Sequence, residues 1–321
     1  MSENIQIKRR FRINKNDLPL WILVGIIILA SIVLTAIEPN FLSSTNIFNI
    51  LQQNTALCLV TLGAGVVLLS GNIDLSVGNM LAVCAVIGGK LVVEGYTDMS
   101  VIIMTLLIGI VFGIINGIIV TYSKVDSFII TLGLLSIYQA LALILCNGNN
   151  VYLKGAFNAL GNSKVGDVPL LVILLAVATV IMVLVMKYTK FSRRIYAIGG
   201  NEEVAFLAGI KINLYKIMVY TISGLFSSLG GLVVLSRIGQ ATPAMGGDYA
   251  LQSITAAVIG GIALSGGRGK IIGAILGGIM LGLITNALNM LRVPSYYQYM
   301  VLGIVIIAAV IVSNLGERNK K

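Results

Sequence analysis

The chain of 321 residues contains no histidine, and only 11% of its residues are charged. Without histidine the commonest general base and metal ligand is missing, which excludes Ser–His and Cys–His catalytic pairs. Soluble domains carry roughly 25% charged residues, whereas this chain is 57% hydrophobic. Together with a mean hydropathy of +0.98, this composition predicts an all-α, polytopic membrane protein without a separate soluble domain.

Cysteine is also scarce, and a nucleotide-binding loop is missing. The 3 cysteines lie in apolar stretches without CxxC spacing, so we expect packing residues and no metal site. The stretch LSGGRGKI at 264–271 has Leu264 where a P-loop needs glycine and Ile271 where it needs serine or threonine. We therefore expect no cofactor in this chain, and energy from a nucleotide has to come from another subunit.

Ten apolar segments are long enough to cross a bilayer, which needs about 20 residues per helix. Glycine clusters near Asp74 and Ser265 blur two boundaries, so eight or nine full spans plus broken pieces remain an alternative. The first apolar run lacks a cleavage site and is expected to be a retained helix. The predicted spans are 19–37, 49–70, 75–93, 100–121, 127–146, 169–187, 214–236, 250–264, 270–291 and 296–313.

The basic residues predict the orientation. With both termini inside, 17 of the 22 Lys and Arg residues fall on inner segments, as the positive-inside rule expects. The net charge of +10 therefore fits loops at a membrane surface, and no basic helix with interleaved aromatics indicates nucleic acid. We expect a cytoplasmic tail over 1–18, a transmembrane domain over 19–313 and a cytoplasmic tail over 314–321.

The chain also resembles itself. Five pairs recur in order at offsets of 166 to 174 residues: GVVLLS with GLVVLS, Asp74 with Asp248, AVIGG with AVIGG, Asn116 with Asn286, and VDSF with VPSY. The first copy covers predicted helices 2–5 and the second covers helices 7–10, so the copies are inverted across the membrane. Inverted repeats are typical of transporters, whose path lies at the repeat interface.

Asp74, in the stretch GNIDLSVG, is the unusual acid of this pattern. An ionised group costs roughly 3 kcal/mol at the bilayer centre. Two interpretations stay open: the carboxylate caps the helix that follows by accepting from its free amides, or it acts in gating or substrate passage. The repeat places Asp74 at the inner end of the second predicted helix and Asp248 at the outer end of the seventh.

The longest inner loop, 187–216, contains a predicted short helix. Asn201 suits the N-cap, Glu202 and Glu203 suit the positive end of the helix dipole, and Gly209 suits the C-terminal end. The apolar residues between these ends need a protein partner. They either pack on the protein's own inner surface or insert into a separate cytoplasmic subunit.

Four stretches carry a resemblance to a known family. AIGGNEEVAFLAGIKINLYKIMVYTISG, GNIDLSVG, GGIALSGGRGKIIGAILG and NALNMLRVPSYYQ resemble, in position and order, the bacterial ribose-type sugar permeases of ABC importers. The resemblance implies ten helices, a permease dimer (homo- or heterodimer), cytoplasmic ABC ATPase subunits that use ATP and Mg, and an external substrate-binding protein. The residues it assigns to the ATPase-coupling loop are Gly200, Asn201, Glu202, Glu203, Ala205 and Gly209.

A neutral polyol needs hydroxyl and amide groups along its path. Such residues also bond simply across helices, so each candidate has a structural alternative. The candidates for the translocation path or gate are Asp74, Asn116, Ser127, Thr131, Gln139, Asp248, Asn286, Asn289 and Ser295. Two polar outer loops, 146–169 and 237–250, are the expected docking surfaces for the binding protein.

We therefore predict the permease subunit of an ATP-driven importer, located in the bacterial plasma membrane, that translocates a ribose-like pentose, a hexose or a related small polar solute. The chain itself is not expected to be an enzyme. A stand-alone secondary carrier or channel is the alternative, and the sequence does not distinguish a sugar from a nucleoside as the substrate.

Overall fold

A computed structural model describes residues 18–318, and describes side-chain burial for residues 20–311. Apart from Leu18, the predicted tail 1–18 lies outside the described residues, as do residues 319–321 of the predicted tail 314–321. The elements are α1 (Leu18–Ile37), α2 (Ser44–Leu69), α3 (Val77–Val93), α4 (Asp98–Ser123), α5 (Ser127–Leu145), β1 (Val151–Tyr152), α6 (Ala159–Asn162), β2 (Lys164–Val165), β3 (Val168–Pro169), α7 (Leu170–Tyr188), α8 (Lys190–Gly200), α9 (Glu202–Leu207), α10 (Ile212–Ile238), β4 (Gln240–Ala241), α11 (Tyr249–Ile259), α12 (Ile271–Met290) and α13 (Ser295–Arg318).

The prediction of a helical, multi-span membrane protein is confirmed. In the described part of the chain, 7 helices are long and apolar enough to cross a membrane: α1, α2, α4, α5, α7, α10 and α12. The remaining predicted spans fall on the shorter apolar helices α3 and α11 and on α13, of which the apolar stretch Ser295–Ile311 is below the required length, so the count of ten stays a prediction. The span predicted over 250–264 ends at Ile259, because Gly260 and Gly261 close the helix and Gly261 has φ +87°.

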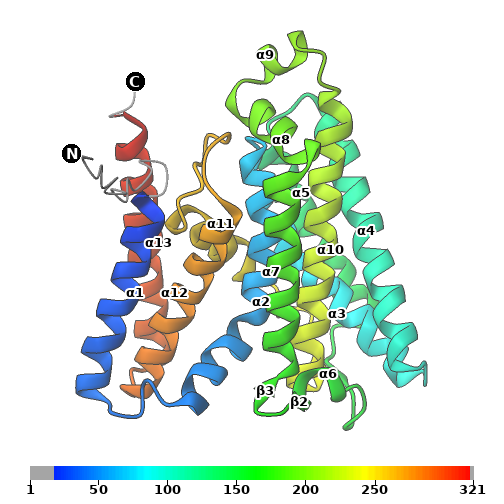
Figure 1. Cartoon of the computed structure of the whole chain (residues 1–321). Helices are drawn as coiled ribbons and strands as arrows, with labels where there is room; N and C mark the ends of the chain where they lie inside the picture. Colours follow the sequence, from blue (N-terminus) through cyan, green and yellow to red (C-terminus); the bar gives the residue numbers. More distant parts are fainter. Residues whose placement is uncertain (1–17, 319–321) are drawn as a thin grey trace, which may run out of the picture.

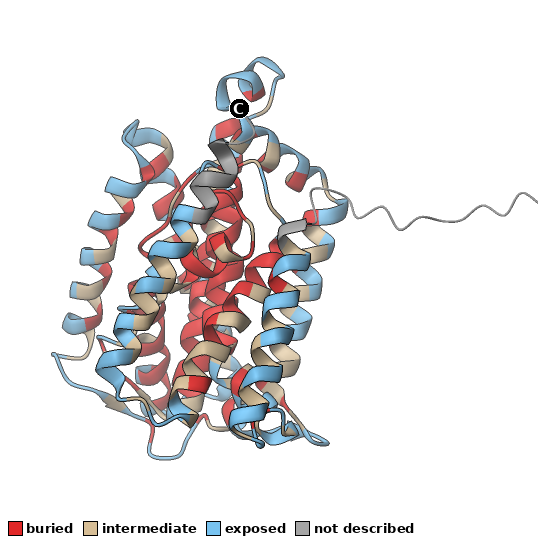
Figure 2. Cartoon of the chain, turned by 90° about the vertical axis from the view of Figure 1, so that its left-hand side faces the viewer, coloured by how far each residue is buried: buried red, intermediate tan, exposed pale blue. Residues whose placement is uncertain are grey.

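Two long helices, α2 and α10, form the centre of the bundle. They pack against each other, and each carries further helices: α11 and α12 on α2, and α3 and α4 on α10. Figure 2 shows the buried residues gathered on these inner helices and the exposed ones on the periphery. Small residues allow the close approach: a Cβ at Gly113 of α4 would lie 2.4 Å from the carbonyl oxygen of Tyr220 in α10.

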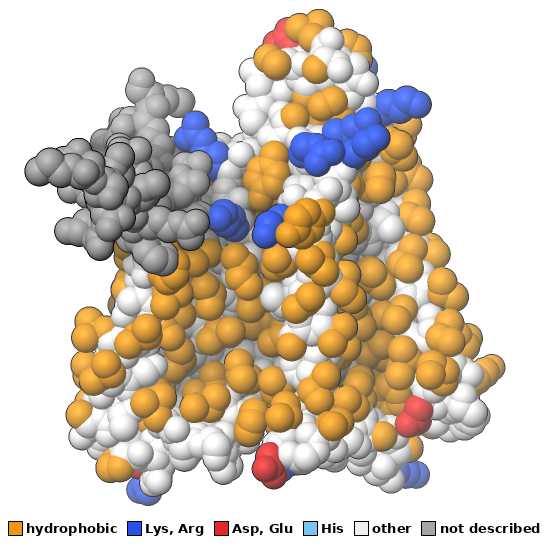
Figure 3. Space-filling view, viewed as in Figure 1, with side chains coloured by type: hydrophobic (Ala, Val, Ile, Leu, Met, Phe, Trp, Pro, Cys, Tyr) orange, Lys and Arg blue, Asp and Glu red, His pale blue; other side chains and the backbone are white. Residues whose placement is uncertain are grey.

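The molecule has two distinct ends (Figure 1). One end, here the α9 end, carries α8, α9, the first residue of α1 and the last turn of α13. The opposite end, here the α6 end, carries α6, β2 and β3. Lys and Arg side chains gather near the α9 end, while the face between the two ends is mostly hydrophobic (Figure 3). A hydrophobic belt between two polar ends is what a bilayer requires.

Candidate functional site

Two short helices of the bundle, α3 and α11, each follow a non-helical segment, and we call them the interrupted helices. Segment 70–76 connects α2 to α3, and segment 242–248, which consists mostly of turns, connects β4 to α11. The starts of α3 and α11 touch through glycine: a Cβ at Gly78 would lie 2.2 Å from the oxygen of Gly246, and a Cβ at Gly246 would lie 2.0 Å from the oxygen of Gly78. Interrupted helices that meet inside a membrane bundle are typical of transporter substrate sites.

Asp74 lies in the first of these segments and is only 2% exposed. Its Oδ1 accepts from the backbone N–H of Ser76 at 3.0 Å and from the Ser76 hydroxyl at 2.6 Å. Its Oδ2 accepts from the hydroxyl of Ser223, on α10, at 2.9 Å. The carboxylate therefore closes the turn before α3 and ties segment 70–76 to α10. It does not bind amides inside the first turn of α3, as a helix cap would.

Two other predicted path residues converge on the same segment. Asn116 of α4 donates from Nδ2 to the Ser76 hydroxyl at 2.8 Å and accepts from the Tyr138 hydroxyl at 2.6 Å. The Ser127 hydroxyl, at the start of α5, accepts from the backbone N–H of Ile73 at 3.0 Å. Asp74, Asn116 and Ser127 thus belong to one buried polar network, in which their polar atoms already have protein partners.

The sequence analysis did not identify two tyrosines of this network. Tyr138 binds Asn116, and the Tyr220 hydroxyl donates to the carbonyl of Ile73 at 3.1 Å. The signal that could have found them is a tyrosine inside an apolar span, because a buried phenol needs a hydrogen-bond partner. Thr131 joins the same region through its hydroxyl, which donates to the carbonyl of Ser127 at 2.8 Å.

Asn79 is a further residue that the sequence analysis missed. It lies in the first turn of α3 beside Gly246, and it is 4% exposed. Its Nδ2 donates to the carbonyl of Leu135 at 2.9 Å, but its Oδ1 has no hydrogen-bond partner. Gln139 reaches segment 242–248 by donating to the carbonyl of Pro243 at 3.2 Å.

The remaining predicted path residues do not join this network. Asn286 of α12 forms a reciprocal amide pair with Asn46 of α2, with both N···O distances at 3.0 Å. Asn289 is exposed and accepts from Gln298 at 2.9 Å, and Ser295 is exposed at the start of α13. Asp248 is exposed, lies directly before α11 and makes no side-chain cap, so its part in a gate stays a prediction.

The predicted short helix in the inner loop is confirmed as α9. Asn201 Oδ1 accepts from the N–H of Val204 at 3.0 Å, and Gly209 follows the helix with φ +76°. Ala205 is buried, whereas the side chains of Val204, Phe206 and Leu207 are 60%, 68% and 78% exposed. An open hollow of about 630 Å³ adjoins these residues, lined by Glu202, Glu203, Phe206, Ile210, Lys211, Ile212 and Asn213.

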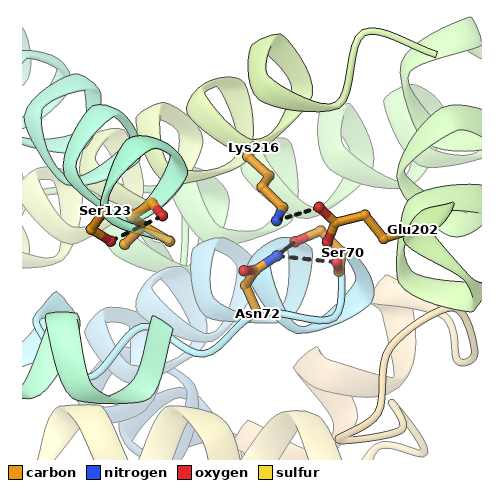
Figure 4. Close-up of polar contacts among 6 residues, drawn as sticks. Ser70, Asn72, Ser123, Glu202 and Lys216 are labelled. Carbon is orange, nitrogen blue, oxygen red and sulfur yellow. Dashed lines mark hydrogen bonds and ion pairs between the residues drawn. The ribbon is translucent and has the colours of Figure 1, made fainter. Parts of the chain in front are cut away.

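The helix before it, α8, was not predicted. Thr189 caps α8, and the Tyr196 hydroxyl donates to the carbonyl of Gly269 at 2.7 Å. Burial raises the pKa of Tyr196, so the hydroxyl stays protonated and remains a donor at neutral pH. Lys216 of α10 forms an ion pair with Glu202 of α9 at 2.8 Å. Figure 4 shows this ion pair together with Ser70 and Asn72, which follow the end of α2. The segment 190–207 is therefore attached to the bundle while its apolar tip stays uncovered.

At the α6 end, the structure joins the two predicted outer loops. Strand β1 of the first loop pairs with β4 of the second in antiparallel register, with Val151 opposite Ala241. The Ser236 hydroxyl also donates to the carbonyl of Phe157 at 2.6 Å and accepts from the N–H of Gly161 at 2.8 Å. These contacts bring the two loops into one surface.

An apolar bundle with interrupted helices inside and an amphipathic helical segment at one end is the architecture of a membrane transport permease. The chain belongs to the family described as "Branched-chain amino acid transport system / permease component", whose model matches residues 46–310. It is 39% identical to the ribose import permease protein RbsC of Bacillus subtilis, over 90% of both chains. It is 35% identical to the D-allose transport system permease protein AlsC of Escherichia coli, over 86% of this chain and 85% of that protein.

The same similarity extends to the galactose/methyl galactoside import permease protein MglC of Salmonella typhimurium, at 33% identity over 96% of this chain and 99% of that protein. No solved structure matches the chain. The predicted resemblance to import permeases is thus confirmed.

Proposed function

We propose that this chain is the membrane-spanning subunit of an ATP-driven importer for a sugar or a closely related small polar solute. The observation that carries the proposal is similarity over at least 85% of the chain to permeases named for ribose, allose and galactose. The preferred substrate class is a ribose-like pentose or a hexose. The chain supplies the path, and a separate subunit hydrolyses ATP with Mg.

We place the α9 end in the cytoplasm of a bacterial cell, with both termini on that side of the plasma membrane. The gathering of Lys and Arg at this end supports the placement through the positive-inside rule (Figure 3). The first residue of α1 and the last turn of α13 lie at the same end, which requires an even number of crossings. Ten crossings satisfy this if α3, α11 and α13 complete the set.

The inverted repeat is part of the proposal, and the pattern of helix contacts supports it. If α2, α3, α4 and α5 correspond to α10, α11, α12 and α13, most of the contacts among these helices have counterparts. α4 packs on α10 as α12 packs on α2, and α5 packs on α3 as α13 packs on α11. The non-helical segments 70–76 and 242–248 then enter the bundle from opposite ends, as alternating access through two inverted halves requires.

The exposed side chains of α9 are the proposed contact for the cytoplasmic ATPase. In water, three neighbouring apolar side chains with more than half of their surface exposed favour burial by a partner protein. In the proposed coupling loop, Gly200 precedes the N-cap residue Asn201, and Glu202 and Glu203 form the acidic first turn of α9. Ala205 is the buried residue of this helix, and Gly209 ends it. The β1–β4 surface at the α6 end is the proposed dock for the external binding protein.

Reconstitution tests the proposal. The permease is placed in proteoliposomes with the ATPase and binding protein encoded beside it, and uptake of labelled ribose, allose, galactose and a nucleoside is measured with and without internal ATP. We expect uptake of one sugar class that requires ATP and both partners. Equal uptake by the permease alone, without ATP, would support the stand-alone carrier instead.

A further inference from the structure

Three chain segments that are far apart in sequence meet backbone to backbone near α8. A Cβ at Gly199 of α8 would lie 2.1 Å from the carbonyl oxygen of Leu69 and 2.6 Å from the nitrogen of Gly267. A Cβ at Gly266 would lie 2.5 Å from the Cα of Gly71. All three distances are well inside van der Waals contact, so no larger residue fits at these positions unless the backbone moves. We call these residues the glycine junction.

Hydrogen bonds hold the glycine junction together. The N–H of Gly267 donates to the carbonyl of Leu69 at 3.0 Å, which joins the 260–270 loop to the end of α2. The Tyr196 hydroxyl donates to the carbonyl of Gly269, which joins the same loop to α8. Gly71 and Gly267 have φ values of +78° and +67°, where side chains other than glycine are strained. The contact is therefore fixed by shape, by bonding and by backbone conformation.

The glycine junction connects α9 to both interrupted helices. On one side, Gly199 is followed by Gly200 and by Asn201, the N-cap of α9. On the α2 side, Gly71 opens the segment that carries Asp74 to the start of α3. On the third side, the 260–270 loop follows directly from α11, whose start touches α3 at the contact between Gly246 and Gly78.

We propose that the glycine junction transmits the displacement of α9 to both interrupted helices, with Gly199 as the positioning residue at its centre. The inference rests on the proposed function and deepens it by naming the route from the ATPase contact to the path. A force on α9 moves the end of α8, and the backbone of α8 has no free space at Leu69 or Gly267 in which to move alone. Segment 70–76 and the 260–270 loop must then move with it.

The chain offers a matched pair of substitutions for the test. Gly199→Ala places a methyl group against Leu69 and Gly267, whereas Gly133→Ala, in α5 and outside the proposed coupling loop, places it where no atom lies within 4 Å. Both changes replace a helical glycine with alanine. The readout is the stimulation of ATP hydrolysis by sugar-loaded binding protein in the complete reconstituted complex. Basal hydrolysis and assembly of the complex are measured alongside.

We expect Gly199→Ala to keep basal hydrolysis and to lose about tenfold or more of the stimulation, within the range of about 5- to 150-fold typical of coupling between sites. Gly133→Ala keeps wild-type stimulation. Tyr196→Phe removes only the hydroxyl that binds Gly269 and is expected to lose about two- to fivefold of the stimulation, the effect of one hydrogen bond.

Wild-type stimulation in Gly199→Ala, or an equal loss in Gly133→Ala, overturns the inference. If the complex with Gly199→Ala does not assemble, the Tyr196→Phe variant provides the test, because normal stimulation of ATP hydrolysis in that variant also overturns the inference. If the wild-type complex itself shows no stimulation by the binding protein, the proposed function fails and the inference fails with it.

Discussion

Replacing Asp74 with alanine tests whether this acid is an anchor of the fold. The carboxylate accepts three hydrogen bonds, at 3.0, 2.6 and 2.9 Å, from the Ser76 backbone, the Ser76 hydroxyl and the Ser223 hydroxyl. Hydrogen bonds to a charged acceptor contribute about 1.5–3 kcal/mol each. Removing a buried carboxylate also removes its desolvation penalty, and the serine hydroxyls can rotate to other acceptors. We therefore expect a net destabilisation of about 2–4 kcal/mol.

The assay is thermal unfolding of the purified permease in detergent. A loss of 1 kcal/mol shifts Tm by about 2–4 °C in chains of 150–250 residues, so Asp74→Ala is expected to lower Tm by about 4–16 °C. Asp74→Asn keeps one carbonyl oxygen for Ser76 and is expected to lose roughly half as much. Ser223→Ala, which removes the single contact to α10, serves as the matched partial variant.

Two results refute the anchoring argument. Asp74→Ala with a Tm within about 2 °C of the wild type shows that the three bonds do not stabilise the fold. Normal stability combined with complete loss of transport shows that Asp74 acts in gating, the other interpretation of its sequence context. An unstable Asp74→Ala alongside a stable, transporting Asp74→Asn supports the anchor.

Three further predictions follow from helix contacts. Asn46→Ala, Asn286→Ala and the double variant form a double-mutant cycle, measured by thermal or denaturant unfolding. The expected coupling energy is about 0.6–2 kcal/mol, and a coupling energy near zero contradicts the amide pair. Gly113→Val forces α4 away from α10 and is expected to destabilise by about 1–3 kcal/mol, whereas Gly25→Val, with no atom within 4 Å, leaves Tm unchanged. Lys216→Gln removes a half-exposed ion pair and is expected to change stability by less than about 1 kcal/mol, so a large drop in Tm contradicts it.

The features that depend on neighbouring residues could be predicted from the sequence. The ends of α9 follow from Asn201 as an N-cap and Gly209 as a residue with positive φ, and both are local choices. Hydropathy likewise predicted the long spans, because a bilayer demands unbroken apolar runs. Helix α8 was missed because four of its first five residues are basic or polar and resemble a loop, although Ile195 and Ile198 are buried.

The features that depend on distant residues could not be predicted. Asn286 pairs with Asn46, 240 positions away, and a single sequence does not show that pairing. The same holds for the three segments of the glycine junction, whose motifs were recognised separately and whose contact is visible only in the structure. For Asp74, the sequence indicated an acid before a helix, but its hydrogen bond with Ser223 on α10 is a tertiary contact that the sequence does not show.

The most direct test of the central claim is the ratio of sugar accumulated to ATP hydrolysed in the reconstituted complex, with α9 intact and with α9 altered. Leu207 is 78% exposed and makes the apolar tip of α9, so Leu207→Asp is expected to abolish ATP-dependent accumulation, while Leu207→Met retains it. Sugar accumulation that continues at the wild-type ratio in Leu207→Asp would contradict the claim that a cytoplasmic ATPase drives this permease through α9.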